Sequence, residues 1–129
     1  MIFLDTSAIY ALADTADPHH TTAYKKFDAA LKSGEQFLIH NYILVECAAL
    51  LQARLGLRAA ILLLQDARGF QIEWVDRVLH QEAQQELERI GKRGISLVDC
   101  ASFVVMRRRG IQKLLAFDSD FPDQGFIIY

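Results

Sequence analysis

Short apolar runs alternate with longer segments of helical periodicity along this chain. The apolar runs predict strands at residues 2–4, 37–40, 70–75, 114–117 and 126–129. The segments between them predict helices at 8–12, 18–33, 42–54, 58–68, 77–90 and 97–109. Strands that alternate with helices in this way form right-handed β-α-β units. We therefore expect one α/β domain over residues 1–129, with a five-stranded, mainly parallel sheet and helices on both faces.

Polar residues mark the predicted helix starts. Asp17 followed by Pro18 is typical of a helix cap and first turn, and Asn41 is expected to cap the helix at 42–54.

The helix at 58–68 is apolar on more than one face. Such a helix must bury both sides, and a second copy of the chain is one way to do so, which favours a homodimer. Trp74 is expected to lie in the core.

Composition narrows the class of protein. The chain has 129 residues, of which 52% are hydrophobic and 23% charged, so it is long enough for one folded domain. A net charge of -2 argues against a general nucleic-acid coat protein but not against an enzyme with a local basic patch. Cys47 and Cys100 form no C-x-x-C pair and are expected to be small buried residues. No signal peptide or apolar run of membrane-spanning length is present, which predicts a soluble cytoplasmic protein.

Acidic residues recur where predicted strands end or where the next helices begin. The carboxyl ends of parallel strands share one edge of a sheet, and ligands of open α/β sheets bind outside that edge. Four acids are expected to meet there, and they are Asp5, Glu46, Asp99 and Asp118.

Carboxylates gathered in one pocket repel each other. Two of them about 5 Å apart cost roughly 3 kcal/mol at an effective dielectric near 20. Protons or divalent cations must relieve this repulsion, and oxygen ligands without histidine or cysteine favour Mg²⁺ or Mn²⁺. A cation of this kind can activate water and hold a phosphodiester for in-line attack.

Each acid also has a purely structural interpretation. Asp99 completes a Ser96-x-x-Asp99 capping box, and Asp118 with Asp120 could form a turn after a strand. Glu46, in contrast, is surrounded by apolar neighbours, which favours a functional role. The four acids together are harder to explain by structure than any one alone.

The ordered motifs resemble those of the PIN-domain family. They are Leu4-Asp5-Thr6-Ser7, the mid-helix Glu46, Ser96-Leu97-Val98-Asp99 and Phe117-Asp118-Ser119-Asp120-Phe121. In size and order the chain looks most like the VapC-type ribonuclease toxins of toxin–antitoxin pairs. The resemblance implies a Mg²⁺- or Mn²⁺-dependent endoribonuclease that cleaves RNA and binds a cognate antitoxin.

The resemblance also assigns residues. Asp5, Glu46 and Asp99 match the metal-binding acids, and Asp118 matches the fourth, with Asp120 as the alternative. Ser7 matches a hydroxyl residue that supports the metal site, and Thr6 is expected to assist it. Family members often have serine or threonine at the position of Asn41.

Basic residues near the carboxyl-terminal end of the chain are candidates for RNA contacts. Arg107, Arg108 and Lys113 are expected to bind phosphate groups, and the other candidates are Arg54, Arg58, Arg68, Lys92, Arg93 and Arg109. Consecutive arginines on a helix cannot all face one way, so a solvated helix end is the alternative. His40 is expected near the proposed site, at the end of a predicted strand. His19 and His20 are expected on the surface.

Two other functions compete with the nuclease. A phosphatase of the haloacid-dehalogenase type would use Asp5 as a nucleophile, but that family resembles D-x-D and residue 7 here is serine. The other alternative is a PIN-like module that binds RNA or protein without turnover.

Overall fold

A five-stranded sheet forms the centre of the computed structural model, which describes residues 1–117 and 120–129. The strand order is β3-β2-β1-β4-β5, and each described pair is parallel. The strands are β1 (Ile2–Leu4), β2 (Phe37–His40), β3 (Gln71–Glu73), β4 (Lys113–Leu115) and β5 (Ile127–Ile128). The predicted sheet is therefore confirmed, although most of its strands are shorter than predicted.

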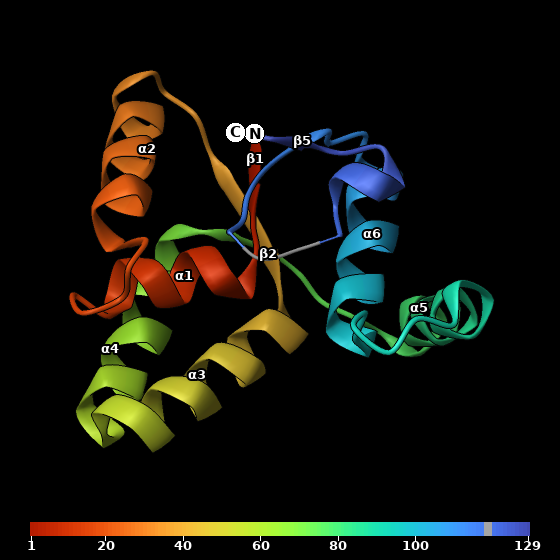
Figure 1. Cartoon of the computed structure of the whole chain (residues 1–129), viewed down its shortest axis with the longest axis horizontal. Coiled ribbons are helices and arrows are strands. Elements are labelled where there is room, and N and C mark those ends of the chain that lie inside the picture. The colour runs from red at the N-terminus through yellow and green to blue at the C-terminus, as the bar shows by residue number, and fades with distance from the viewer. Residues whose placement is uncertain (118–119) are drawn as a thin grey trace.

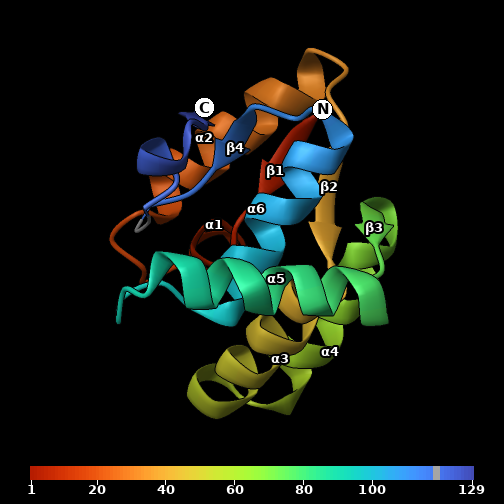
Figure 2. The same ribbon diagram turned by 90° about the vertical axis from the view of Figure 1, so that its right-hand side faces the viewer.

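Helices cover both faces of this sheet, as predicted. Figure 1 places α1 and α2 on one side of β1 and β2, and α5 and α6 on the other. Figure 2 shows α6 against the sheet and α5 running across its end. The helices are α1 (Thr6–Ala13), α2 (His20–Lys32), α3 (Asn41–Leu55), α4 (Leu57–Asp66), α5 (Arg77–Ile90) and α6 (Leu97–Arg109), with short 3-10 helices η1 (Ala67–Gly69) and η2 (Pro122–Gln124). No helix in the described ranges has both the length and the apolar character needed to cross a bilayer.

The core includes all of β1 and most of α6, together with residues from the helices on the other face of the sheet. All three residues of β1 are fully buried, and so is the α6 segment at 100–106 apart from traces of exposure. Phe103 of α6 packs edge-on against Phe121, with ring centres 5.1 Å apart. Burying a phenylalanine contributes about 2–3 kcal/mol, so this pair firmly anchors the segment that follows β4.

The chain changes direction across the sheet at β1. Connections after β1 lead to β2 and β3 on one side, whereas β4 and β5 lie on the other. The crevice outside the carboxyl ends of β1 and β4 is therefore the topological switch point, where open α/β sheets bind ligands. Backbone bonds join the two strand ends, since the N–H of Asp5 donates to the carbonyl of Leu115 at 3.1 Å.

The starts of α2 and α3 are organised differently from the prediction. The second helix begins at His20 rather than Pro18, because the Asp17 carboxylate accepts the N–H of His19 at 2.8 Å and closes a tight turn instead. Helix α3 is capped by His40, whose Nδ1 accepts the N–H of Ile43 at 3.3 Å. The predicted cap, Asn41, is the first residue of that helix.

Asn41 and Trp74 have roles that the pattern did not indicate. The side-chain oxygen of Asn41 accepts the N–H of Val75 at 2.6 Å and so ties the end of β3 to α3. The prediction that Trp74 lies in the core is wrong, because 66% of its surface is exposed. It follows the short strand β3 at the sheet edge, where one side of the chain faces solvent.

The two cysteines are free and buried, as predicted. Burial raises the pKa of Cys47 to about 12, and burial together with the nearby Asp99 charge raises that of Cys100 to about 11. Neither thiol therefore ionises near neutral pH, and both behave as small apolar groups of the core.

Candidate active site

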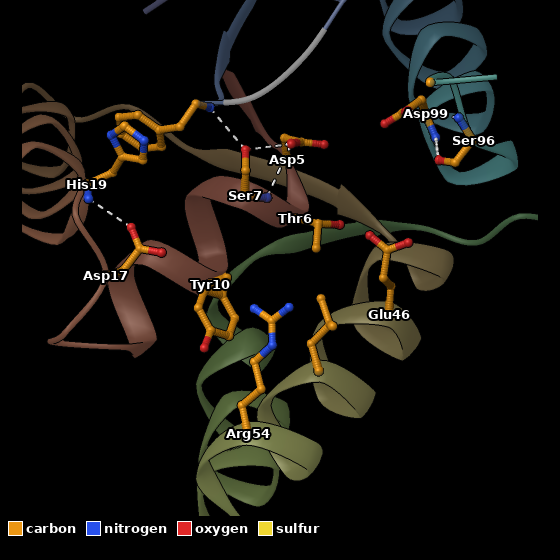
Figure 3. A pocket seen from close by; sticks show the side chains of 13 residues that line it. Asp5, Thr6, Ser7, Tyr10, Asp17, His19, Glu46, Arg54, Ser96 and Asp99 are labelled. Atoms are coloured by element: carbon orange, nitrogen blue, oxygen red, sulfur yellow. Dashed lines mark hydrogen bonds between the residues drawn. The ribbon is translucent and has the colours of Figure 1, made fainter. Parts of the chain in front are cut away.

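A cavity of about 440 Å³ opens at the switch point of the sheet. Figure 3 shows that its walls come from the start of α1, the inner face of α3 and the start of α6. The lining residues are Asp5, Thr6, Ser7, Tyr10, Asp17, His19, Glu46, Leu50, Arg54, Gly94, Ser96, Asp99 and Phe117. Three of the four acids expected at this edge thus line one cavity.

Asp5 is the most enclosed of these acids, with only 5% of its surface exposed. It caps α1, and its Oδ2 accepts the Ser7 N–H at 3.2 Å and the Ser7 hydroxyl at 2.7 Å. The same hydroxyl accepts the N–H of Phe117 at 3.0 Å. The start of a helix favours negative charge, and these bonds fix the direction of the carboxylate. Ser7 therefore orients Asp5 and links it to the end of β4.

Thr6 contributes a buried polar atom to the cavity. Its Oγ1 is buried, and among the described atoms it makes no hydrogen bond. Buried hydroxyl groups are normally bonded, so such an atom beside a polar cavity suits a water molecule or another ligand. This observation supports a site that binds a polar guest next to Asp5.

Glu46 enters the cavity from the second turn of α3. Its carboxylate points away from the helix and toward the cavity, below Asp5 in Figure 3. The neighbouring Cys47 points into the core, where the negative charges of Glu46 and Asp5 add to the burial that raises its pKa. Adjacent residues of one helix thus serve the cavity and the core separately.

Asp99 forms the predicted capping box and also lines the cavity. Its Oδ2 accepts the N–H of Ser96 at 3.0 Å, and the Ser96 hydroxyl accepts the N–H of Asp99 at 3.0 Å. This capping box holds the start of α6. The side chain also lines the cavity, so the structural role does not remove Asp99 from the site.

Comparison with known proteins places this geometry in a family. The model of the PIN domain matches residues 2–127. The chain belongs to the PIN-domain family. It is 36% identical over 129 residues to the 23S rRNA-specific endonuclease VapC20 of Mycobacterium tuberculosis, in strains CDC 1551 / Oshkosh and ATCC 25618 / H37Rv. The alignment covers 98% of this chain and 96% of the relative.

A solved structure supports the same assignment. The crystal structure of Mycobacterium tuberculosis VapC20, described as a Sarcin-Ricin loop cleaving toxin, matches with a TM-score of 0.86 at 35% identity. The match covers 98% of this chain and 97% of that chain. The predicted membership of the PIN-domain family, close to the VapC-type toxins, is therefore confirmed.

The acids that line the cavity of this PIN domain have the oxygen ligands that a hard divalent cation prefers. Asp5, Glu46 and Asp99 supply oxygen ligands around one cavity, and the one histidine of its described lining, His19, stacks on Phe117. Within residues 1–117 and 120–129, however, no group of three side chains from aspartate, glutamate, histidine or cysteine lies close enough together to hold a metal ion. Asp118 lies outside the described residues. Asp120 is half-buried and is not among the described lining residues.

The predicted RNA-contact residues lie away from the cavity of this PIN domain. Arg107 and Arg108 pair with acids of α5, at 3.6 Å from Glu86 and 2.6 Å from Glu82. Lys113 begins β4 at the opposite edge of the sheet and lies 3.3 Å from Glu35. The structure therefore does not place these three cations beside the acids that line the cavity.

Several lining residues were not expected at the site, among them Tyr10, His19 and Phe117. Tyr10 follows from helical spacing, because it lies one turn after Ser7 on α1. His19 and Phe117 stack with ring centres 4.6 Å apart at the cavity wall. No local pattern indicates this pair, since it joins a turn to the end of β4. His40, in contrast, is fully buried and is not among the described lining residues.

Proposed function

We propose that this PIN domain is a metal-dependent endoribonuclease that hydrolyses RNA phosphodiester bonds. The observation that carries the proposal is the set of three carboxylates, Asp5, Glu46 and Asp99, around one cavity at the switch point. Similarity to VapC20, a toxin endonuclease, along nearly the whole chain supports it. By the same similarity, we propose that the protein acts as a toxin in the cytoplasm and is restrained by a cognate antitoxin.

Mg²⁺ or Mn²⁺ is the cofactor we propose. Asp5, Glu46 and Asp99 would hold it, with Asp118 or Asp120 as the fourth acid. A bound divalent cation offsets the repulsion among the acids, activates water and stabilises charge that develops on the phosphate. The Thr6 hydroxyl, which has no hydrogen-bond partner among the described residues, suits a role beside it.

The side chains of the cavity have separate tasks in this proposal. Ser7 holds Asp5 in one orientation through the bonds described above. Glu46 or Asp99 accepts the proton of the attacking water, since both carboxylates line the cavity in which the scissile phosphate would lie. The buried base of the cavity, formed by Asp5 and Thr6, limits the water that reaches the reacting atoms.

Removal of metal tests the proposal. Purified protein, shown to be free of antitoxin, is expected to cut a 23S rRNA fragment that contains the sarcin–ricin loop into discrete products with Mg²⁺ or Mn²⁺. EDTA should abolish these products, and excess Mg²⁺ should restore them. Products that form equally in EDTA would contradict metal dependence. No cleavage of this fragment or of a mixed RNA pool would favour the binding module.

We further propose a homodimer that uses the outer face of α4. Leu57, Ile61 and Leu64 follow helical spacing on this face and are 60%, 43% and 47% exposed. An exposed apolar stripe of this kind is typical of an interaction surface.

Light scattering at micromolar concentration tests the dimer. The parent is expected to show twice the monomer mass, and Ile61→Glu is expected to show the monomer mass, because a buried charge disrupts an apolar interface. Val78→Glu is the control, since Val78 is an exposed apolar residue of α5, 56% exposed. A monomeric parent would contradict the homodimer.

The competing functions make different predictions. A binding module would retain metal-independent RNA or protein binding that Asp5→Asn leaves unchanged. A phosphatase would turn over simple phosphate esters, but it would need an acid in place of Ser7, whose hydroxyl here supports Asp5.

A further inference from the structure

Arg54 extends into the cavity from the last turn of α3. Glu46, Leu50 and Arg54 are spaced four residues apart, so they lie along one face of the helix, and all three line the cavity. Figure 3 shows the guanidinium reaching up beside Tyr10, on the far side of the cavity from Asp99. Arg54 is the one lysine or arginine among the lining residues that the structure describes.

The guanidinium lies against an aromatic ring, and the charge of the nearby Asp14 carboxylate attracts it without an ion pair between the two described side chains. Its central carbon lies 5.1 Å from the centre of the Tyr10 ring, which is within range of a cation–π contact. The Tyr10 hydroxyl in turn donates to Oδ2 of Asp14 at 2.8 Å. Asp14 is further fixed by the N–H of Ala16 at 2.9 Å, so the ring has a defined position.

Several other cations of the chain are paired with acids. Arg107, Arg108, Arg109 and Lys113 each lie within 4 Å of a glutamate. Arg54 has no such ion pair among the described residues, so the N–H donors of its planar fork remain for a ligand. In a cavity lined by carboxylates, a cation with this placement favours an anionic ligand.

We propose that Arg54 binds a phosphate group of the RNA next to the scissile one, with Tyr10 and Asp14 as positioning residues. The proposal rests on the proposed function. Arg54 lies eight residues after Glu46, which is about 12 Å along a helix axis, so it meets a different phosphate from the one at the acids. A guanidinium fork suits a phosphate because two parallel N–H bonds can form at once.

RNA binding tests this proposal without cleavage. Binding of a fluorescent single-stranded RNA is measured with Mg²⁺ in an Asp5→Asn background, which keeps the RNA intact. Adding Arg54→Gln is expected to weaken binding roughly tenfold and to reduce the slope of log affinity against log salt by about 0.7, the loss of one phosphate contact. Arg54→Lys should restore the slope but only part of the affinity, because lysine keeps the charge and loses the fork.

A matched control separates this contact from general charge. Arg77→Gln removes one positive charge from an exposed position of α5 outside the described lining, and it should leave affinity and slope unchanged. Unaltered binding by Arg54→Gln, or an equal loss in Arg77→Gln, would overturn the proposal. Absence of RNA binding by the parent background would overturn it as well.

The positioning role of Tyr10 has its own test. With cleavable RNA, Tyr10→Leu should raise KM several-fold and leave kcat within about twofold, since the ring acts on binding and not on the reacting atoms. In the Arg54→Gln background, Tyr10→Leu should have no further effect. Additive effects of the two changes would contradict the positioning role. Failure of the parent to cleave bears on the nuclease, whereas the binding comparison bears on Arg54, so the two proposals fail separately.

Discussion

Asp5→Asn is expected to lower RNA cleavage by about three orders of magnitude, or about 4 kcal/mol of transition-state stabilisation, and to leave the fold intact. Asp5 is the most enclosed carboxylate of the cavity and the one fixed in orientation by Ser7. Asparagine removes its negative charge and hence its attraction for a divalent cation. The amide oxygen still accepts the Ser7 N–H, because asparagine caps helices as well as aspartate does.

Two measurements on the same preparations separate activity from stability. Initial cleavage rates give the loss of activity, and thermal unfolding should show a free energy of unfolding within about 1 kcal/mol of the parent. Asp28→Asn is the control, since Asp28 lies on α2 and pairs with Lys32 at the surface. The role of Asp5 would be wrong if Asp5→Asn cleaved RNA at the rate of the Asp28→Asn control.

The second large effect expected is a loss of stability in mild acid that originates at His40. This side chain is fully buried, and burial lowers its pKa to about 3. Its Nδ1 accepts the Ile43 N–H, so the proton lies on Nε2, which donates to the Ser102 hydroxyl at 2.9 Å. That hydroxyl donates onward to the carbonyl of Val98 at 3.1 Å. A second ring proton would lie on Nδ1, where it would meet the Ile43 N–H donor instead of an acceptor.

The direction of the effect follows from the two pKa values. An unfolded histidine gains its proton as pH falls through 6.5, whereas folded His40 stays neutral until about pH 3. Between these values the unfolded state binds more protons, so stability is full above pH 6.5 and falls as pH decreases. The slope approaches about 1.4 kcal/mol per pH unit, which gives about 2 kcal/mol between pH 7 and pH 5.

Urea unfolding at pH 7 and pH 5 measures this loss. His40→Asn keeps an acceptor for the Ile43 N–H and does not titrate, so its stability should change by about 2 kcal/mol less over the same interval. Comparing the two proteins removes the contribution of groups that both contain. Nuclear magnetic resonance of the parent gives a direct reading, in which the His40 ring should remain neutral at pH 5. Equal pH dependence of the two proteins would contradict this assignment.

Much of the fold follows from local sequence pattern. The predictions that were wrong share one cause, because each concerns a residue whose environment depends on tertiary structure. The apolar run before Asp5 and the Ser96-x-x-Asp99 box each concern neighbours in the chain, and both form as predicted. Asn41 fits a cap equally well by sequence, yet its partner is Val75 from another strand. Trp74 has the residue type of a core position, and only its place beside an edge strand explains its exposure.

The candidate site divides in the same way. Its acids could be predicted because carboxyl ends of parallel strands share one edge, whatever the details of packing. The roles of the cations could not be predicted in this way. The partners of Arg107 and Arg108 are glutamates of α5, and only the tertiary structure brings these glutamates near α6. Arg54 was one candidate among many until the Tyr10 ring and the cavity wall distinguished it.

The bond between Ser7 and Phe117 has a consequence for the timing of synthesis. It spans 110 residues, and the neighbour of β1 on that side is β4, which begins at Lys113. A chain that is still being translated can carry Asp5, Glu46 and Asp99 before β4 has left the ribosome. Contacts so distant in sequence form late in folding, so the cavity closes only when nearly the whole chain is available. The candidate site is therefore complete only when synthesis of the chain is nearly finished.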